Sequence, residues 1–292
     1  MRTVIVLAVL AASALSGCGG SATAGGKLDV VAAENVYGNI AAQIGGSRVS
    51  VASILTDPNA DPHLFEPGTS SGLAVAKAKV VLQNGLGYDA FMTKLEDAAP
   101  SSGRITVTIA DVLGVHGKDA NPHLWYDVPR LGRIAGAIAA ALEHADPRHA
   151  SAYRAGLFRF ESLLGPLRQE VATIRARFHD TRVAYTEPVP GYLVTAAGLR
   201  NLAPDSFTRS IEGGTEPAPS DVAAMHALIA QHRVRVLLYN SQAVSPITAR
   251  LRAAAQRAGI PVVPVTETLP AGQTFQQWQL GQARAIAAAL AQ

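Results

Sequence analysis

The sequence predicts an α/β protein in which two (β/α) lobes with parallel sheets are joined by one long backbone helix. Short runs of β-branched residues alternate with helical patterns in both halves of the chain, which is typical of βαβ units. Between the halves, an apolar stripe continues at helical spacing for about seven turns. The chain has 292 residues, of which 48% are hydrophobic and 16% charged, enough for two folded lobes.

Seven strands are predicted from runs rich in β-branched residues. They cover residues 28–33, 49–55, 80–84, 105–110, 182–186, 234–240 and 261–266. Helices are predicted to begin near Asn35, Ser70, Tyr88, Ser220, Ser245 and Gln273, and another to span residues 128–145. Because strands and helices alternate, we expect the strands of each half to lie parallel.

The apolar stripe of the connecting segment has intervals of 4, 3, 4, 3, 4, 3 and 4 residues. It consists of Tyr153, Leu157, Phe160, Leu164, Leu167, Val171, Ile174 and Phe178. A helix of that length is about 38 Å long and can span both lobes. Pro166 should kink or split it. The stripe suits packing on the chain's own lobes, and the alternative is a coiled coil with another chain.

These patterns set the expected domain boundaries. We expect an N-terminal lobe at residues 28–146, a connecting helix at 147–180 and a C-terminal lobe at 181–292.

The first residues have the features of an export signal. Arg2 is followed by an apolar run at residues 4–15, which is too short for a membrane span. Small residues then precede Cys18, the only cysteine, in a pattern that resembles a bacterial lipobox. We therefore expect a signal peptide at 1–17, lipidation of Cys18 and a flexible tether at 18–27. An ordinary signal peptide with an incidental cysteine is the alternative.

Two similar motifs contain the candidate metal-binding histidines. His63 lies in "ADPHLFEP" after the second predicted strand, and His123 lies in "NPHLWYD" after the fourth. Glu187 and Glu267 directly follow predicted strands of the second half. Loops at the carboxyl ends of parallel strands meet at one crevice, and two imidazoles with two carboxylates suit a divalent transition metal. The sequence therefore predicts a metal site formed by these four residues.

The neighbouring residues suggest how this site is supported. The preceding prolines stiffen both histidine loops. Asp61, Glu66 and Asn121 are candidates to accept the second ring N–H of the histidines. Trp125 and Tyr126 are expected to wall the cleft, and Asp127 to cap the following helix. His116 lies between glycine-containing segments and is expected to be an exposed loop residue.

The motifs together resemble the metal-binding solute-binding proteins of ABC importers for zinc and manganese. The similar segments are "ADPHLFEP", "NPHLWYD", the long connecting helix, "YTEPVPGYL" and "VTETLPAGQTFQQW", and they extend over the mature chain. The resemblance implies two lobes, a single linking helix, a metal ion held by two ligands from each lobe, and delivery to a membrane permease.

Two departures from the family pattern bear on the metal. Zinc-binding members often carry a histidine-rich loop, whereas residues 64–122 contain only His116. They also tend to have a third histidine where this chain has Glu187. Glutamate at that position is typical of manganese or iron members, but the last ligand of those members is usually aspartate, whereas this chain has Glu267. Both Zn²⁺ and Mn²⁺ therefore remain candidates, bound as transported substrate.

The sequence also bears on several other possible functions. The net charge is +3 without a Lys/Arg cluster among aromatic residues, so we expect no nucleic-acid partner. A metal-dependent hydrolase is an alternative, but no HExxH helix is present and we expect a binding protein, not an enzyme. A surface adhesin or a binder of another small ligand is a further alternative. The preferred interpretation is a monomeric protein of the cell envelope, lipid-anchored outside the cytoplasm, that supplies an ABC permease.

Overall fold

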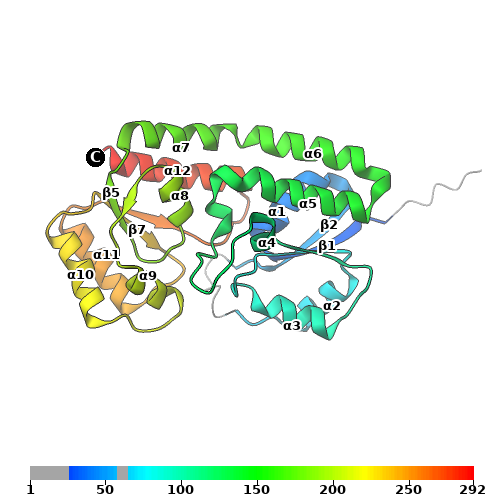
Figure 1. The fold of residues 1–292 in the computed structure, drawn as a ribbon, viewed down its shortest axis with the longest axis horizontal. Helices are drawn as coiled ribbons and strands as arrows, with labels where there is room; N and C mark the ends of the chain where they lie inside the picture. The colour runs from blue at the N-terminus through cyan, green and yellow to red at the C-terminus, as the bar shows by residue number, and fades with distance from the viewer. Residues whose placement is uncertain (1–25, 58–64) are drawn as a thin grey trace, which may run out of the picture.

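The structure is a computed structural model that describes residues 26–57 and 65–292. Two four-stranded sheets, each with parallel strands, lie side by side. A pair of consecutive helices runs along both lobes (Figure 1). This confirms the predicted α/β fold with two lobes. The predicted signal peptide, Cys18, Asp61 and His63 lie outside the described residues.

The sheet of the N-terminal lobe has the strand order β2-β1-β3-β4. Its strands are β1 (Leu28–Glu34), β2 (Val49–Leu55), β3 (Val80–Gln83) and β4 (Ile105–Thr108). Its helices are α1 (Asn35–Gly45), α2 (Thr69–Lys77), α3 (Ala90–Ala98), α4 (Ile109–Leu113) and α5 (Leu131–Ala145), with 3-10 turns at Gly46–Arg48, Leu124–Tyr126 and Val128–Arg130. The predicted fourth strand was too long, because Ile109 and Ala110 begin α4. Both are buried and apolar, so hydrophobicity alone did not distinguish strand from helix.

The sheet of the C-terminal lobe has the order β6-β5-β7-β8. Its strands are β5 (Arg182–Tyr185), β6 (Arg200–Asn201), β7 (Val236–Asn240) and β8 (Val262–Val265). Its helices are α8 (Gly191–Ala196), α9 (Asp205–Glu212), α10 (Pro219–Ala230), α11 (Pro246–Arg257) and α12 (Phe275–Leu290). Three short elements were not predicted from the sequence, namely β6, α8 and α9, which have two, six and eight residues. Elements this short give too few repeats for a periodic signal.

The connecting segment consists of two helices, α6 (Ala150–Leu163) and α7 (Gly165–Phe178), after a 3-10 turn at Pro147–His149. They meet at Leu164, and Pro166 lies in the first turn of α7, where its missing N–H breaks no helical hydrogen bond. Six of the eight stripe residues are buried and the other two are half-buried. Helix α6 packs on α1 and α5, whereas α7 packs on α12 (Figure 1). The stripe thus faces the chain's own lobes.

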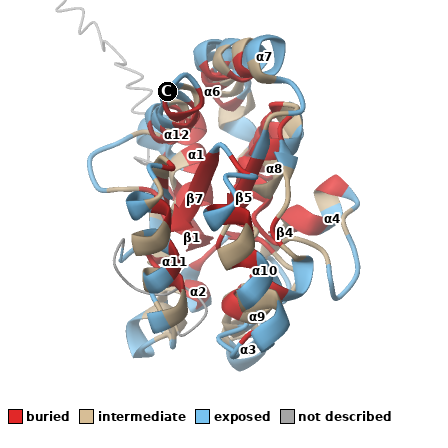
Figure 2. Cartoon of the chain, turned by 90° about the vertical axis from the view of Figure 1, so that its left-hand side faces the viewer, coloured by how far each residue is buried: buried red, intermediate tan, exposed pale blue. Residues whose placement is uncertain are grey.

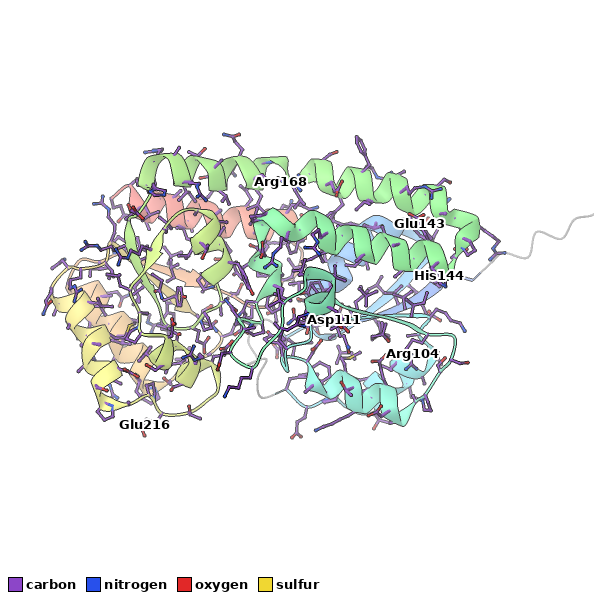
Figure 3. All side chains as sticks on the ribbon, viewed as in Figure 1. Arg104, Asp111, Glu143, His144, Arg168 and Glu216 are labelled. Carbon is purple, nitrogen blue, oxygen red and sulfur yellow. The ribbon has the colours of Figure 1, made fainter. Side chains whose placement is uncertain are left out.

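Hydrophobic side chains of both lobes and both connecting helices form one main core. Figure 2 shows the strands β1, β5 and β7 buried beneath their helices. Glu143 of α5 lies on the outer surface (Figure 3). It accepts a 2.7 Å hydrogen bond from Arg154 of α6. Among the described residues, no helix has the length and apolar character needed to cross a membrane.

Candidate metal site between the lobes

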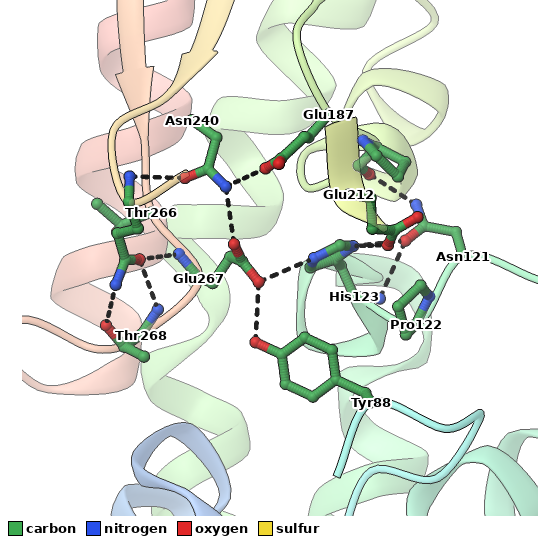
Figure 4. Close-up of polar contacts among 12 residues, drawn as sticks. Tyr88, Asn121, Pro122, His123, Glu187, Glu212, Asn240, Thr266, Glu267 and Thr268 are labelled. Atoms are coloured by element: carbon green, nitrogen blue, oxygen red, sulfur yellow. Dashed lines mark hydrogen bonds and ion pairs between the residues drawn. The ribbon is translucent and has the colours of Figure 1, made fainter. Parts of the chain in front are cut away.

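Three of the four predicted ligands lie together where the two lobes face each other (Figure 4). His123 precedes the Leu124–Tyr126 turn, Glu187 follows β5, and Glu267 follows β8. Their exposed fractions are 0%, 1% and 1%. The carboxyl ends of both sheets point into this interface, so loops distant in sequence converge there. The fourth predicted ligand, His63, is outside the described residues.

Asn121 fixes the ring of His123. The amide nitrogen of Asn121 donates to the Pro188 carbonyl at 2.7 Å, which leaves its oxygen as an acceptor. That oxygen lies 3.0 Å from the His123 backbone nitrogen and 2.8 Å from Nδ1. We infer that Nδ1 carries a proton and that Nε2 presents its lone pair. Glu212 adds a carboxylate oxygen 3.7 Å from the same Nδ1.

The lone pair of His123 is directed at a carboxylate. Nε2 lies 3.2 Å from Oε2 of Glu267, so two electron-pair donors face each other across the lobe interface. A proton or a metal ion must lie between such groups to make the contact favourable. Two ligands bound to one zinc ion in tetrahedral geometry are about 3.4 Å apart, close to the separation observed here.

Tyr88 supports the same carboxylate from the N-terminal lobe. Its hydroxyl donates a 2.9 Å hydrogen bond to Oε2 of Glu267. Burial, reinforced by the charge of Glu267, raises the pKa of Tyr88 well above its ordinary value, so the phenol keeps its proton. Tyr88 ends a turn in which Gly85, Leu86 and Gly87 all have positive φ, at 84°, 57° and 81°. For Leu86 this conformation is strained by about 1–2 kcal/mol.

Asp89 holds that strained turn in place. Its carboxylate accepts backbone hydrogen bonds from Asn84 at 2.5 Å and from Gly85 at 2.9 Å. The Asn84 side chain accepts a 2.6 Å hydrogen bond from Tyr37 and donates one to the Pro122 carbonyl at 2.9 Å. The turn that carries Tyr88 is therefore tied to the loop that carries His123.

The two carboxylates of the C-terminal lobe are bridged by an amide. Nδ2 of Asn240 donates to Oε2 of Glu187 and, at 2.7 Å, to Oε1 of Glu267 (Figure 4). Gln242 supports the second carboxylate through its backbone, because its Oε1 accepts from the N–H groups of Glu267 at 2.5 Å and Thr268 at 3.1 Å. Within residues 26–57 and 65–292, no three His, Cys, Asp or Glu side chains are already arranged as a complete metal-binding group. His123 contacts Glu267 directly, and Glu187 is linked to Glu267 through Asn240.

The other residues predicted around the site are two buried aromatic residues, one capping residue and two exposed residues. Trp125 and Tyr126 are fully buried, and the Trp125 ring packs edge-to-face on His123 with centroids 5.4 Å apart. Asp127 caps the next turn as predicted, since it accepts from the Arg130 N–H at 3.3 Å. His116 is exposed, with its nearest carboxylate, Asp111, at 4.0 Å, and Glu66 is also exposed.

Four residues of this site were not predicted from the sequence: Tyr88, Asn240, Gln242 and Glu212. The prediction rested only on imidazoles and carboxylates near strand ends, and none of these four residues except Glu212 has such a group. Asn240 and Gln242 follow the buried run "VLLY" at the same sheet edge as Glu187 and Glu267, so the strand-end rule applied to amides would have found them. Tyr88 and Glu212 carry no comparable local signal.

Comparison with known proteins identifies the family. The profile of the family described as "Zinc-uptake complex component A periplasmic" (ZnuA) matches residues 30–289. The chain belongs to this ZnuA family. The ZnuA family consists of metal-binding solute-binding proteins of ABC transporters, which confirms the resemblance and the expectation that the chain is not an enzyme.

Individual proteins that are similar to this chain are also described as metal-binding proteins. The chain is 30% identical over 229 residues to the manganese-binding lipoprotein MntA of Bacillus subtilis, covering 70% of this chain and 72% of MntA. It is 26% identical over 233 residues to a putative metal-binding protein of Treponema pallidum, covering 72% and 71% of the two chains. The solved periplasmic zinc-binding protein TroA of Treponema pallidum superposes with a TM-score of 0.76 over 91% of this chain and all of TroA. At 20% identity that likeness establishes the fold.

Proposed function

We propose that the chain captures Zn²⁺ or Mn²⁺ between its lobes, outside the cytoplasm, and delivers the ion to the permease of an ABC importer. The observation that carries this proposal is the 3.2 Å contact between Nε2 of His123 and Oε2 of Glu267. This contact joins one lobe to the other and becomes favourable when a cation lies between the two atoms.

We assign the ion four ligands, His63, His123, Glu187 and Glu267. Two carboxylates balance the charge of a divalent ion, which lowers the cost of holding that charge in a buried site. The buried position of three of these side chains and the hydrogen bond from His123 to Asn121 support the assignment. The ion must share the carboxylates with the Asn240 amide, which bonds to one oxygen of each.

Calorimetric titration of metal-free protein with Zn²⁺ and with Mn²⁺ tests the ligand set. His63→Ala and His123→Ala should each weaken binding by more than about 100-fold, since changes to supporting residues alone already cost about 10–100-fold. Glu187→Ala and Glu267→Ala should also bind weakly. His116→Ala is the matched control, because its imidazole is exposed, and it should bind like the wild type. Wild-type affinity in Glu267→Ala would show that the assignment is wrong.

We further propose that Cys18 carries a lipid that anchors the protein to the outer face of a bacterial membrane. The names of relatives such as the lipoprotein MntA support this. Cys18→Ala should move the exported protein from the membrane fraction to the soluble fraction without changing its metal affinity. Recovery of the wild-type protein only in the soluble fraction would contradict the anchor.

A further inference from the structure

The amide of Asn240 lies between the two carboxylates because of the strand order. Strand β7, which ends at Asn240, lies between β5, which precedes Glu187, and β8, which precedes Glu267. One side-chain NH₂ group therefore reaches a carboxylate on each side. Its two hydrogens are both used, one for each glutamate.

The orientation of this amide is fixed by its surroundings. Oδ1 of Asn240 accepts a 3.0 Å hydrogen bond from the Gln242 backbone N–H, so the oxygen faces the loop and the NH₂ group faces the carboxylates. The backbone N–H of Asn240 donates to the Thr186 hydroxyl at 3.1 Å. Asn240 is only 1% exposed, so water cannot readily replace either contact.

The amide engages one particular oxygen of each carboxylate, namely Oε2 of Glu187 and Oε1 of Glu267. A cation that bound both oxygens of either carboxylate would lie against amide hydrogens, which carry positive partial charge. Binding through the other oxygen alone avoids that repulsion. The amide therefore favours monodentate binding by both glutamates.

We propose that Asn240 is a positioning residue that determines metal specificity by restricting Glu187 and Glu267 to one oxygen each. The inference rests on the ligand set of the proposed function. With one oxygen from each glutamate, few oxygen atoms reach the ion, which suits the four-coordinate geometry that Zn²⁺ prefers. Mn²⁺ prefers more oxygen ligands in octahedral geometry, which bidentate carboxylates would supply. The intact amide thus favours Zn²⁺ over Mn²⁺.

Two substitutions test this inference by different means. Asn240→Ala removes the amide, and Asn240→Asp keeps the side-chain shape and the acceptor for Gln242 but removes the donor. Competitive titration should show the preference for Zn²⁺ over Mn²⁺ falling by about tenfold or more in both variants. Co²⁺ bound to the wild type should show the intense visible absorption of a four-coordinate ion, and this absorption should weaken in both variants as further oxygens bind.

Asn201→Ala is the matched control. Asn201 also ends a strand of this sheet, but its side chain bonds only to the backbone of Ala203 in the described contacts. Circular dichroism would verify that each variant is folded. Equal weakening of both metals with an unchanged Co²⁺ spectrum would overturn the role in specificity and leave Asn240 with a general supporting role. If the wild type bound neither metal, the proposed function itself would fail.

Discussion

Glu34 is a buried acid that no part of the proposed metal site uses. It ends β1 and is 2% exposed, while Asp89 nearby is 3% exposed. Burial raises the pKa of Glu34 well above its ordinary value, and the negative charge of Asp89 raises it further. Burial also raises the pKa of Asp89, but the two backbone hydrogen bonds that its carboxylate accepts oppose this and stabilise its charged form. We therefore expect Glu34 to be the protonated member of the pair.

The raised pKa of Glu34 makes folding stability depend on pH. Above about pH 4.5 the unfolded chain loses this proton, whereas the folded protein keeps it until the raised pKa is reached. The stabilisation from the proton is therefore complete at acid pH and is lost as pH rises, by up to about 1.4 kcal/mol per pH unit. Glu34→Gln mimics the protonated acid and should remove this loss.

Urea unfolding of wild type and Glu34→Gln between pH 5 and pH 8 measures the effect. The stability of the variant relative to wild type should rise with pH. Glu216→Gln changes an exposed glutamate (Figure 3) and should follow the wild type. A constant difference between wild type and Glu34→Gln across this range would show that Glu34 is ionised in the folded protein.

At the scale of single residues, the sequence predicted those site residues that lie near the ends of strands or in a repeated motif. Glu187 and Glu267 follow strands, whereas His123 lies in a repeated motif in the loop after α4. The structure places His123 against Glu267 and links Glu187 to Glu267 through Asn240. Their role as metal ligands stays a prediction. Tyr88 could not be found in this way, because its position depends on a turn with three positive φ angles and on contact with the opposite lobe. No local pattern encodes such a contact.

At the scale of elements, α6 and α1 cross at unusually close range. A Cβ atom at Gly156 would lie 2.1 Å from the carbonyl oxygen of Ile44, and backbone cannot move aside as a side chain can. Gly156 is buried within α6, where glycine otherwise lowers helix stability. Close packing of the connecting helix on the N-terminal lobe explains why glycine is required.

Gly156→Ala should therefore destabilise the protein by about 1–3 kcal/mol, although alanine is the better helix former. Gly136→Ala in α5 is the matched control, because a Cβ atom there meets nothing within 4 Å. The control should be neutral or stabilising by up to about 1 kcal/mol. Thermal unfolding of both variants measures the difference. Similar midpoints for the two would contradict the close crossing.

Helices and strands were predicted correctly where their hydrophobic pattern extends over many residues. The eight-residue stripe predicted the connecting helix, and Pro166 predicted its division. The missed element α9 carries Glu212, which approaches His123, so the error in the fold also hid part of the site. Eight residues give little more than two turns, and such a pattern is weak in sequence.

At the scale of the whole molecule, the lobes are joined by direct hydrogen bonds as well as by α6 and α7. Asn35 donates to the Leu269 carbonyl at 2.8 Å and accepts from the Leu269 N–H at 2.9 Å. The Tyr126 hydroxyl donates to the Thr266 carbonyl at 2.7 Å, and the amides of Gln43 and Gln276 pair at 3.0 Å. These contacts oppose wide rotation of one lobe against the other.

We therefore expect metal binding to change the radius of gyration by less than about 1 Å, with most ordering confined to loops. Small-angle scattering of metal-free and metal-loaded protein measures this, and the forward intensity should correspond to a single chain. Asn35→Ala removes both bonds to Leu269 and should increase the difference between the two states. Compaction of several ångströms in the wild type would contradict the rigid arrangement.

The shared strand order of the two sheets has a consequence for the origin of the chain. In each lobe the second strand is at the edge, followed by the first, third and fourth. A buried glutamate comes at or just after the first strand in both, as Glu34 and Glu187, and a buried asparagine at or just after the third, as Asn84 and Asn240. Tandem duplication of one ancestral lobe would leave this correspondence. On that history, Glu187, the carboxylate that we propose binds cargo, corresponds to Glu34, the carboxyl that we expect to retain a proton in the core.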